Sequence, residues 1–213
     1  MQPLRAGSTV LVLAPHTDDG EFGAGGSIAR WVEEGHRIVY AAFSSCEASL
    51  PKDMPADTLI RELKEAAKVL GVCEDNLIIH NFPVRRFQEH RQEILETMLD
   101  IRVKFSPSIV LMPSVRDVHQ DHGTVAQEAM RAFKRDTLVA YEVPWNNFQF
   151  TSNLFVKLEQ RHVDLKVAAI SKYISQRDRA YAQEDYVVAQ TRYRGTQVHE
   201  QFAETFEVLR WLM

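Results

Sequence analysis

The sequence has 213 residues, a length that fits one sizeable α/β domain better than two small ones. Hydrophobic residues make up 45% and charged residues 25%, which is the composition of an ordinary soluble globular protein. The formal net charge of -4 argues against nucleic acid as the main partner, because nucleic-acid binding usually needs a basic surface.

Strand and helix patterns alternate over the first two-thirds of the chain. Continuous runs of apolar, β-branched residues predict buried strands, and apolar residues at helical spacing predict amphipathic helices. In chain order these are the strand 8–14, the helix 25–34, the strand 37–43, the helix 58–70, the strand 77–80, the helix 89–104, the strand 109–112, the helix 122–133 and the strand 138–141. Beyond residue 141 the pattern is less regular. It predicts strands near 155–159 and 205–209, with a long helical stretch around 163–190 between them.

This alternation determines the expected fold class. Strands that alternate with helices imply right-handed crossovers and a parallel sheet. We therefore predict an α/β fold, with a Rossmann-like, mostly parallel sheet and helices on both faces. No repeat, low-complexity tract or linker divides the chain, so a single domain is expected over residues 1–213. In such sheets ligands bind beyond the carboxyl ends of the strands.

Two polar segments follow predicted strands. The segment 15–21 (PHTDDGE) follows the first strand, and the segment 116–122 (RDVHQDH) follows the strand 109–112. Histidine and aspartate ligands with an open position are typical of catalytic zinc sites. Either segment alone could be a polar loop whose aspartates cap a helix. Two such segments at strand ends of one sheet favour a metal site.

Other polar features carry less information. Gly23, Gly25 and Gly26 are not spaced as a dinucleotide fingerprint and follow two aspartates that would repel a pyrophosphate, so nucleotide binding is disfavoured. The histidines outside the two segments are expected on the surface or in packing contacts: His36, His80, His90, His162 and His199.

The cysteines, the N-terminal stretch and the lengths of the apolar runs indicate the compartment of the protein and its relation to membranes. Cys46 and Cys73 have no metal-site or redox-motif spacing and are expected to be buried thiols in a reducing compartment. The N-terminal stretch lacks the pattern of a signal peptide. No apolar run approaches the roughly 20 residues that a membrane-spanning helix needs. These features predict a cytoplasmic protein.

Several segments resemble one known family, the LmbE-like or PIG-L deacetylases. Residues 16–26 (HTDDGEFGAGG) resemble its H-x-D-D-x-E-x-G-x-G-G loop. Residues 116–122 resemble its second motif, in which H-P-D-H follows an acid two places earlier. Residues 62–71 (ELKEAAKVLG) are similar to its E-x-x-x-A-x-x-x-L-G helix, and RYRG at 192–195 with AETF at 203–206 to its C-terminal region. The likeness spans nearly the whole chain.

The sequence departs from the family pattern at three positions. Leu59 stands three residues before Glu62, where the family has an arginine, although Arg61 is close by. This departure concerns how the substrate is held. Gln120 replaces the usual proline, and Thr17 stands where proline or alanine is common. The last two changes are expected to adjust loop stiffness.

The resemblance implies a zinc-dependent N-deacetylase, which hydrolyses the acetamide of an N-acetylated sugar or glycoconjugate to acetate and a free amine. N-acetylglucosamine-like compounds are the implied substrates. His16, Asp19 and His122 would bind the zinc, with open positions for water and the substrate carbonyl. The same ligands would accept iron or cobalt in place of zinc.

The resemblance also implies catalytic roles. Asp18 would be the general base that takes a proton from the attacking water, and would then return it to the departing amine. His119, kept as an imidazolium by a hydrogen bond to Asp121, would stabilise the negative oxygen that develops on the carbonyl. Adjacent side chains of an extended loop point to opposite sides, so Asp18 would face the water while Asp19 faces the metal.

Four residues are candidates for substrate binding: Arg61, Asp117, Trp145 and Arg194. Trp145 belongs to the segment 142–153 (EVPWNNFQFTSN), which follows the fifth predicted strand and is expected to line or cover the cleft. Its aromatic and amide side chains suit stacking on a sugar ring and hydrogen bonding to hydroxyl groups. The alternative is an ordinary loop whose aromatic residues pack on the core or on a subunit interface.

Two other functions are compatible with parts of the sequence. A non-catalytic Rossmann-like binding module is disfavoured by Asp18 and His119, because a binder needs no base beside a metal. A metal hydrolase acting on another amide or ester is the second, although the H-x-E and P-C-x-x-C pair of zinc deaminases is absent. The sequence leaves open the group that carries the acetamide, the physiological metal and the oligomeric state, including a homo-oligomer.

Overall fold

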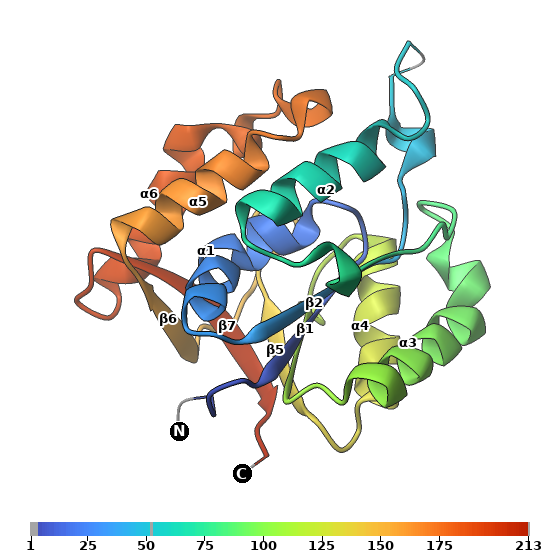
Figure 1. Ribbon diagram of the computed structural model, residues 1–213, viewed down its shortest axis with the longest axis horizontal. Helices are drawn as coiled ribbons and strands as arrows, with labels where there is room; N and C mark the ends of the chain where they lie inside the picture. Colours follow the sequence, from blue (N-terminus) through green and yellow to red (C-terminus); the bar gives the residue numbers. More distant parts are fainter. Residues whose placement is uncertain (1–3, 52, 213) are drawn as a thin grey trace.

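The computed structural model describes residues 4–51 and 53–212. Within them, seven strands form one sheet in the order β3-β2-β1-β4-β5-β7-β6 (Figure 1). Neighbouring strands from β3 to β5 pair in parallel, and β7 pairs antiparallel with both β5 and β6. The strands are β1 (Thr9–Ala14), β2 (Arg37–Ala42), β3 (Leu77–Ile79), β4 (Ile109–Pro113), β5 (Thr137–Tyr141), β6 (Leu154–Leu158) and β7 (Phe202–Arg210). The predicted mostly parallel α/β sheet is confirmed.

Helices cover both faces of this sheet, as predicted (Figure 1). They are α1 (Asp19–Glu33), α2 (Thr58–Val69), α3 (Arg91–Phe105), α4 (Gln120–Ala132), α5 (Gln160–Ile170) and α6 (Glu184–Thr196). Helices α3 and α4 pack on one face, and α1, α2 and α5 pack on the other. No helix within residues 4–51 and 53–212 is long and apolar enough to cross a membrane.

The central strand β1 explains why the core has two halves. Its side chains alternate between the two faces. Val10 and Val12 belong to the cluster under α1 and α2, whereas Leu11 and Leu13 belong to the cluster under α3 and α4. All four are fully buried. A strand that is covered on both faces therefore reads as a continuous apolar run in the sequence.

Helix α1 begins at Asp19, six positions earlier than the predicted helix at 25–34. Gly20, Gly23, Gly25 and Gly26 lie in this first part of the helix, although glycine is a poor helix former in isolation. In the fold they allow close packing instead. A Cβ atom at Gly23 would lie 2.3 Å from the ring of Tyr141, and one at Gly26 would lie 2.5 Å from Leu158. Tertiary contacts at these glycines therefore accompany the early start of the helix.

The predicted long helix at 163–190 is wrong in one respect. It is two helices, α5 and α6, separated by 3₁₀ turns at Ile174–Gln176 and Ala180–Ala182. Buried Tyr173 donates its hydroxyl hydrogen toward the Thr17 carbonyl oxygen at 2.8 Å, and Glu62 accepts hydrogen bonds from the backbone and side chain of Ser175. These contacts tie the connection to the start of α1 and to α2.

The two cysteines differ from each other. Cys46 is buried, as predicted, but Cys73 is exposed. Cys73 directly precedes the turn Glu74–Asn76 between α2 and β3. The prediction of two buried thiols was therefore wrong for Cys73.

Replacing Gly23 by alanine should destabilise the fold. The new methyl group would overlap the buried ring of Tyr141, whose hydroxyl is fixed by a hydrogen bond to the Leu13 carbonyl oxygen at 2.9 Å. Overpacking of this kind costs about 1–3 kcal/mol in the free energy of unfolding. Gly123→Ala in α4 is the matched control, because no atom outside its chain neighbours and the nearby backbone of its own helix lies within 4 Å of its Cβ position. It should stabilise by about 0.4–1 kcal/mol.

Chemical denaturation of both variants measures these free energies. Equal stability of Gly23→Ala and Gly123→Ala would contradict the close approach of α1 to β5.

Candidate active site

Two neighbouring strands bring the polar segments together. Strands β1 and β4 pair in parallel and end at the same edge of the sheet. The segment 15–19 leads from β1 into α1, and the segment 114–119 leads from β4 into α4. The rings of His16 and His122 lie 5.0 Å apart, centroid to centroid. The edge predicted to hold the site is therefore where these side chains meet.

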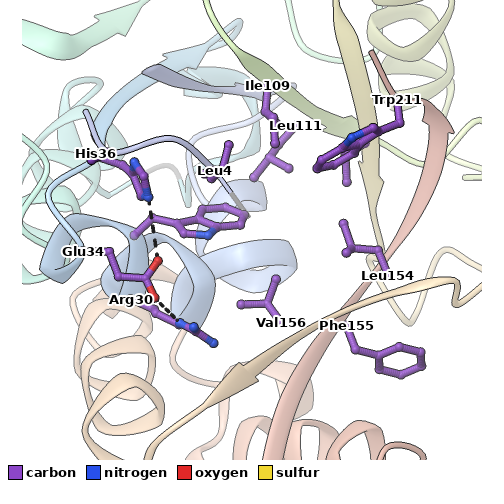
Figure 2. A pocket seen from close by; sticks show the side chains of 13 residues that line it. Leu4, Arg30, Glu34, His36, Ile109, Leu111, Leu154, Phe155, Val156 and Trp211 are labelled. Carbon is purple, nitrogen blue, oxygen red and sulfur yellow. Dashed lines mark hydrogen bonds and ion pairs between the residues drawn. The ribbon is translucent and has the colours of Figure 1, made fainter. Parts of the chain in front are cut away.

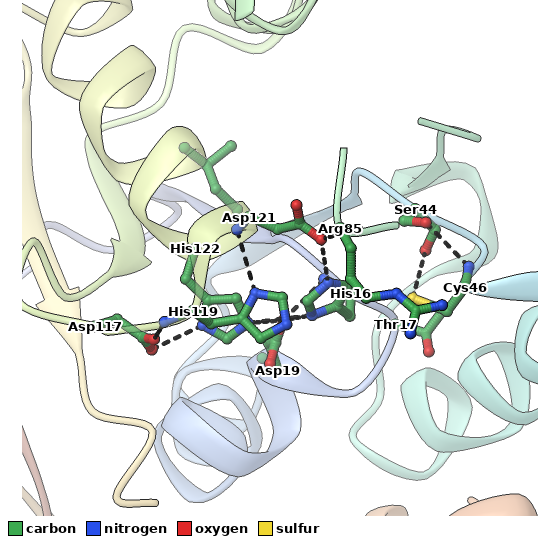
Figure 3. A network of polar contacts seen from close by, with 12 residues as sticks. His16, Thr17, Asp19, Ser44, Cys46, Arg85, Asp117, His119, Asp121 and His122 are labelled. Atoms are coloured by element: carbon green, nitrogen blue, oxygen red, sulfur yellow. Dashed lines mark hydrogen bonds and ion pairs between the residues drawn. The ribbon is translucent and has the colours of Figure 1, made fainter. Parts of the chain in front are cut away.

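Three atoms of these segments form a nearly equilateral triangle (Figure 3). His16 Nδ1 and His122 Nε2 are each 3.2 Å from Asp19 Oδ2 and 3.1 Å from each other. Ligand atoms of a tetrahedral zinc site, with bonds of about 2.0–2.1 Å, are separated by about 3.3 Å. The three atoms thus have the spacing that one small divalent cation requires.

A carboxylate lies behind each histidine of this triangle. His16 Nε2 is 3.1 Å from Asp121 Oδ2, and His122 Nδ1 is 2.8 Å from Asp117 Oδ2. Both carboxylates are fully buried. When the ring is neutral, donation from the outer nitrogen fixes the ring orientation and leaves the inner nitrogen with a free lone pair. Carboxylate–histidine pairs of this kind accompany metal ligands.

His119 lies beside the triangle but is bonded differently. Ligand atoms of His16, His119 and His122 all lie within 4.8 Å of one another, so these three histidines are a candidate metal cluster. However, His119 Nδ1 accepts a hydrogen bond from the backbone N–H of Asp121 at 3.2 Å. The neutral ring therefore carries its hydrogen on Nε2 and has no lone pair free for a metal.

The expected hydrogen bond between His119 and Asp121 is present, but it is made by the backbone N–H of Asp121 and not by its carboxylate. That carboxylate contacts His16 and the backbone N–H groups of Arg85 and Phe87. Burial, followed by the nearby rings of His16 and His122, lowers the pKa of His119. His119 is consequently a neutral hydrogen-bond donor at pH 7, and the imidazolium assigned to it from the sequence does not fit this environment.

The charges of the triangle favour a cation. Burial by itself would lower the pKa of His16, but the carboxylate of Asp19 and the bond to Asp121 raise it to about 9. Burial likewise opposes protonation of His122, yet Asp19 and Asp117 raise its pKa to about 10. Despite burial, both histidines hold the pKa of Asp19 well below its usual range. The carboxylates therefore stabilise positive charge at this point, whether protons or a metal ion carry it.

Asp18 has a different environment from Asp19. Burial and then the neighbouring carboxylate of Asp19 raise the pKa of Asp18 to about 6. The expected extended loop was wrong, because Asp18 has the helix-like angles φ -104° and ψ -8° directly before the first residue of α1. Asp18 and Asp19 therefore differ in direction because the chain turns into α1 between them, and not because they alternate along a strand. Asp18 still lines the cavity next to the triangle.

A buried carboxyl group supports the loop from behind. Glu21 contacts the hydroxyl groups of Tyr40 at 2.5 Å and Tyr173 at 3.1 Å. The same hydroxyls lie 3.0 and 2.8 Å from the carbonyl oxygen of Thr17. Burial raises the pKa of Glu21 to about 8, so this carboxyl is mainly protonated at pH 7. Glu21 fixes the backbone of the loop and does not line the cavity.

A cavity of about 310 Å³ opens above the triangle. Trp145 lies on its wall, stacked on Tyr181 with ring centroids 3.9 Å apart, and contacts Phe22 edge-on at 5.0 Å. Trp145 thus packs on neighbouring aromatic rings and lines the cavity at the same time. Its segment was expected either to line the cleft or to pack its aromatic residues on the core, and Trp145 does both. Phe148 of the same segment is 87% exposed and does not line the cavity.

Three of the four substrate-binding candidates lie outside this cavity. Arg61 is exposed on α2 and pairs with Asp57 at 3.2 Å. Arg194 pairs with Glu142 at 2.6 Å, joining α6 to the end of β5. Asp117 lies behind His122, as described above. Each of the three side chains pairs with a residue that the sequence pattern does not single out, and substrate binding by them stays a prediction.

The sequence missed several residues that line the cavity. They are Cys46, Ser49, Leu59, Val84, Arg85, Asn146, Gln176, Arg179 and Tyr181. Most come from irregular connections, which carry no periodic signal. Only Asn146 lies in a segment that was predicted to line the cleft.

A larger cavity of about 530 Å³ lies elsewhere, near the start of β4 (Figure 2). Its walls are mainly apolar and include Trp31, Leu154 and Trp211. Arg30 and Glu34, its charged residues, pair with each other at 2.7 Å. This cavity contains no arrangement of ligand atoms like that of the triangle, so the chemistry is assigned to the smaller one.

Comparison with known proteins agrees with this assignment. The GlcNAc-PI de-N-acetylase (PIG-L) family model matches residues 11–133, more than half of the chain and both polar segments. The uncharacterized deacetylase YaiS of Escherichia coli K12 is 29% identical over 172 residues, which cover 78% of this chain and 90% of that protein.

Solved structures share the fold at lower identity. The N,N'-diacetylchitobiose deacetylase of Pyrococcus horikoshii has a TM-score of 0.80 and 18% identity, covering 95% of this chain and 84% of that one. The 4-carboxy-2-hydroxymuconate hydratase GalB of Pseudomonas putida KT2440 also has a TM-score of 0.80, with 21% identity and coverage of 97% and 98%. The fold alone therefore does not determine the reaction. The match of the family model over the site segments does place the chain: it belongs to the GlcNAc-PI de-N-acetylase, or PIG-L, family.

Proposed function

We propose that the protein is a metal-dependent N-deacetylase that hydrolyses the acetamide of an N-acetylated sugar or sugar conjugate. Acetate and a free amine would be the products. The observation that carries the proposal is the triangle of His16 Nδ1, Asp19 Oδ2 and His122 Nε2 with Asp18 beside it. Membership of a de-N-acetylase family supports the same reaction.

His16, Asp19 and His122 would hold the metal. Their atoms have tetrahedral spacing, whereas the hydrogen on His119 Nε2 disfavours that ring as a ligand. Two nitrogen ligands and one oxygen ligand suit zinc, and also iron or cobalt. A bound divalent cation would polarise the acetamide carbonyl and lower the pKa of water at the site.

Asp18 would move the proton during the reaction. Its pKa of about 6 leaves it mainly ionised at pH 7, and near enough to neutrality to give the proton back. As a carboxylate it would accept a proton from the attacking water. As a carboxylic acid it would then protonate the amine as the C–N bond breaks, which restores the starting state.

His119 would stabilise the carbonyl oxygen as it gains negative charge. Because Nδ1 accepts the Asp121 N–H, the hydrogen on Nε2 is the one available for donation. A neutral donor held in place before the reaction needs no reorganisation when the charge develops. The sequence suggested an imidazolium in this role. The neutral ring would stabilise the same carbonyl oxygen in the same step.

Trp145 and Tyr181 would contact the sugar. Their stacked rings form an apolar wall of the cavity above Asp18 and the triangle. Aromatic walls with a few polar groups are typical of small-molecule sites, and a sugar presents an apolar face to such rings. The acetamide would then point toward the floor, where Asp18 and His119 lie.

Metal binding should depend steeply on pH. With pKa values of about 9 and 10, His16 and His122 are protonated at pH 7 when no cation is bound. A metal must displace these protons, so its apparent affinity should increase as the pH rises toward those values. If binding displaces up to about two protons, the apparent metal affinity should rise by up to about a hundredfold per pH unit between pH 6 and 8. Titration calorimetry with Zn²⁺ in buffers of different ionisation enthalpy counts the protons.

Binding that releases no proton and is independent of pH would show that these histidines are not the ligands. His122→Ala serves as the control and should lose the binding event.

Asp18→Asn should retain the metal and lose activity. The amide has the size of the carboxylate but cannot accept the proton of the attacking water, so turnover should fall by about 10²–10⁴. The measurement is acetate release from a panel of N-acetylated sugars and conjugates by the zinc-loaded protein, with metal content determined in parallel. A variant that keeps its metal and a rate near that of the wild type would move the base to another residue.

A further inference from the structure

The rim of the active-site cavity carries two arginine side chains without carboxylate partners. Arg85 and Arg179 both line the cavity, and neither forms an ion pair within residues 4–51 and 53–212. The hydrogen bond of the Arg85 guanidinium is to the carbonyl oxygen of Ala48, at 3.3 Å. Nearby arginines outside the cavity differ, since Arg86 pairs with Glu89 at 2.6 Å and Arg177 lies 3.9 Å from the carboxylate of Asp178.

Arg85 is held in place by the same carboxylate that orients His16. Its backbone N–H donates to Asp121 Oδ2 at 2.5 Å, and the N–H of Phe87 is 3.3 Å from the other oxygen. The φ angle of Arg85 is 68°, a left-handed conformation that is uncommon for residues other than glycine. Figure 3 shows Arg85 beside His16. The loop thus fixes the backbone of Arg85 beside His16, and its exposed side chain lines the cavity.

Arg179 reaches the cavity from a different part of the chain. It lies between the two 3₁₀ turns of the connection from α5 to α6. Gln176 and Tyr181 of this connection also line the cavity. Hydrogen bonds between Ser175 and Glu62 anchor the connection to α2. The two guanidinium groups therefore come from separate, independently anchored segments.

The charges around the cavity are distributed unevenly. Its acidic lining residues are Asp18 and Asp19, and both lie on the floor beside the triangle. The lining also contains neutral residues such as Ser49, Asn146 and Gln176. Its two arginines are exposed, whereas Asp19 is buried and Asp18 is half-buried, so the arginines form the outer rim. This positive rim belongs to a chain whose formal net charge is -4, so it does not reflect a generally basic surface. An anionic group that enters the cavity would be attracted to the rim.

We propose that the substrate carries a carboxylate or phosphate group apart from its acetamide, and that Arg85 and Arg179 bind this group. Guanidinium groups match the planar geometry of these oxygens and form charge-assisted hydrogen bonds with them. The assignment rests on the proposed deacetylation, because it places the acetamide on the floor and the anion at the rim. It selects anionic N-acetylated sugars over neutral ones.

Three acetamides test the assignment with the zinc-loaded protein. N-acetylglucosamine is neutral, N-acetylglucosamine 6-phosphate carries a phosphate and N-acetylmuramic acid carries a carboxylate. At least one anionic substrate should exceed the neutral one about tenfold or more in kcat/KM, as charge-assisted contacts allow. Its advantage should shrink as salt is raised, because partly exposed charges are screened. Comparison of the rates on the phosphate and the carboxylate substrate shows which anion the two arginines accept.

Arginine variants separate the rim from the rest of the site. Arg85→Ala and Arg179→Ala should each lower kcat/KM for the preferred anionic substrate about tenfold, while N-acetylglucosamine changes about twofold or less. Arg86→Ala and Arg177→Ala are matched controls on the same segments and should leave both substrates unchanged. Equal rates on all three acetamides, or equal losses on neutral and anionic substrates, would overturn the anionic assignment and leave deacetylation intact.

A binding experiment decides the question without turnover. Calorimetry should detect tighter binding of glucosamine 6-phosphate or muramic acid than of glucosamine, and the Arg85→Ala and Arg179→Ala variants should lose this difference. If none of the three acetamides releases acetate, the proposed function fails on these substrates while the binding result still tests the rim. Equal binding of charged and neutral amines would overturn the assignment.

Discussion

The site depends on carboxylates that are buried beside histidines. Asp117 and Asp121 are each bonded to one ring of the triangle and Asp19 to both, at distances of 2.8–3.2 Å. Buried carboxylates are costly unless positive charge or hydrogen-bond donors compensate them. Here positive charge and hydrogen-bond donors both come from His16 and His122, whose inner nitrogens face the same point. A small divalent cation placed there would supply the positive charge that protons supply in its absence.

The same constraint explains how helix α1 is held. Its first residue, Asp19, must stay fixed relative to β4 and α4, so the helix is anchored along its length. Glu204 of β7 accepts hydrogen bonds from the backbone of Gly26 and Ser27, and forms a buried ion pair with Lys166 at 2.6 Å. The Lys166 ammonium group also donates to the Phe22 carbonyl oxygen. The C-terminal strand and α5 thereby fix a helix that begins at the other end of the chain.

The sequence predicted those features that depend on local pattern. The buried strands, the mostly parallel sheet and the meeting of His16 with His122 follow from apolar runs and from strand ends that share one edge. It failed where tertiary contacts override local preference, as at the glycines of α1 and at Ser175, whose bonds to Glu62 accompany the break between α5 and α6. It gave no sign of the pairing of Arg194 with Glu142, which appears only in the fold. Arg85 and Arg179 gave no signal, since irregular connections bring them to the cavity.

The identity of the metal ligands is the point on which the account of the site depends. Anomalous diffraction from crystals grown with Zn²⁺ or Co²⁺ would locate the ion directly. We expect one peak within about 2.0–2.2 Å of His16 Nδ1, Asp19 Oδ2 and His122 Nε2. His119 should remain outside the coordination sphere, with its Nδ1 still accepting the Asp121 N–H. A peak bonded to His119 in place of Asp19, or the absence of any peak at the triangle, would contradict the account.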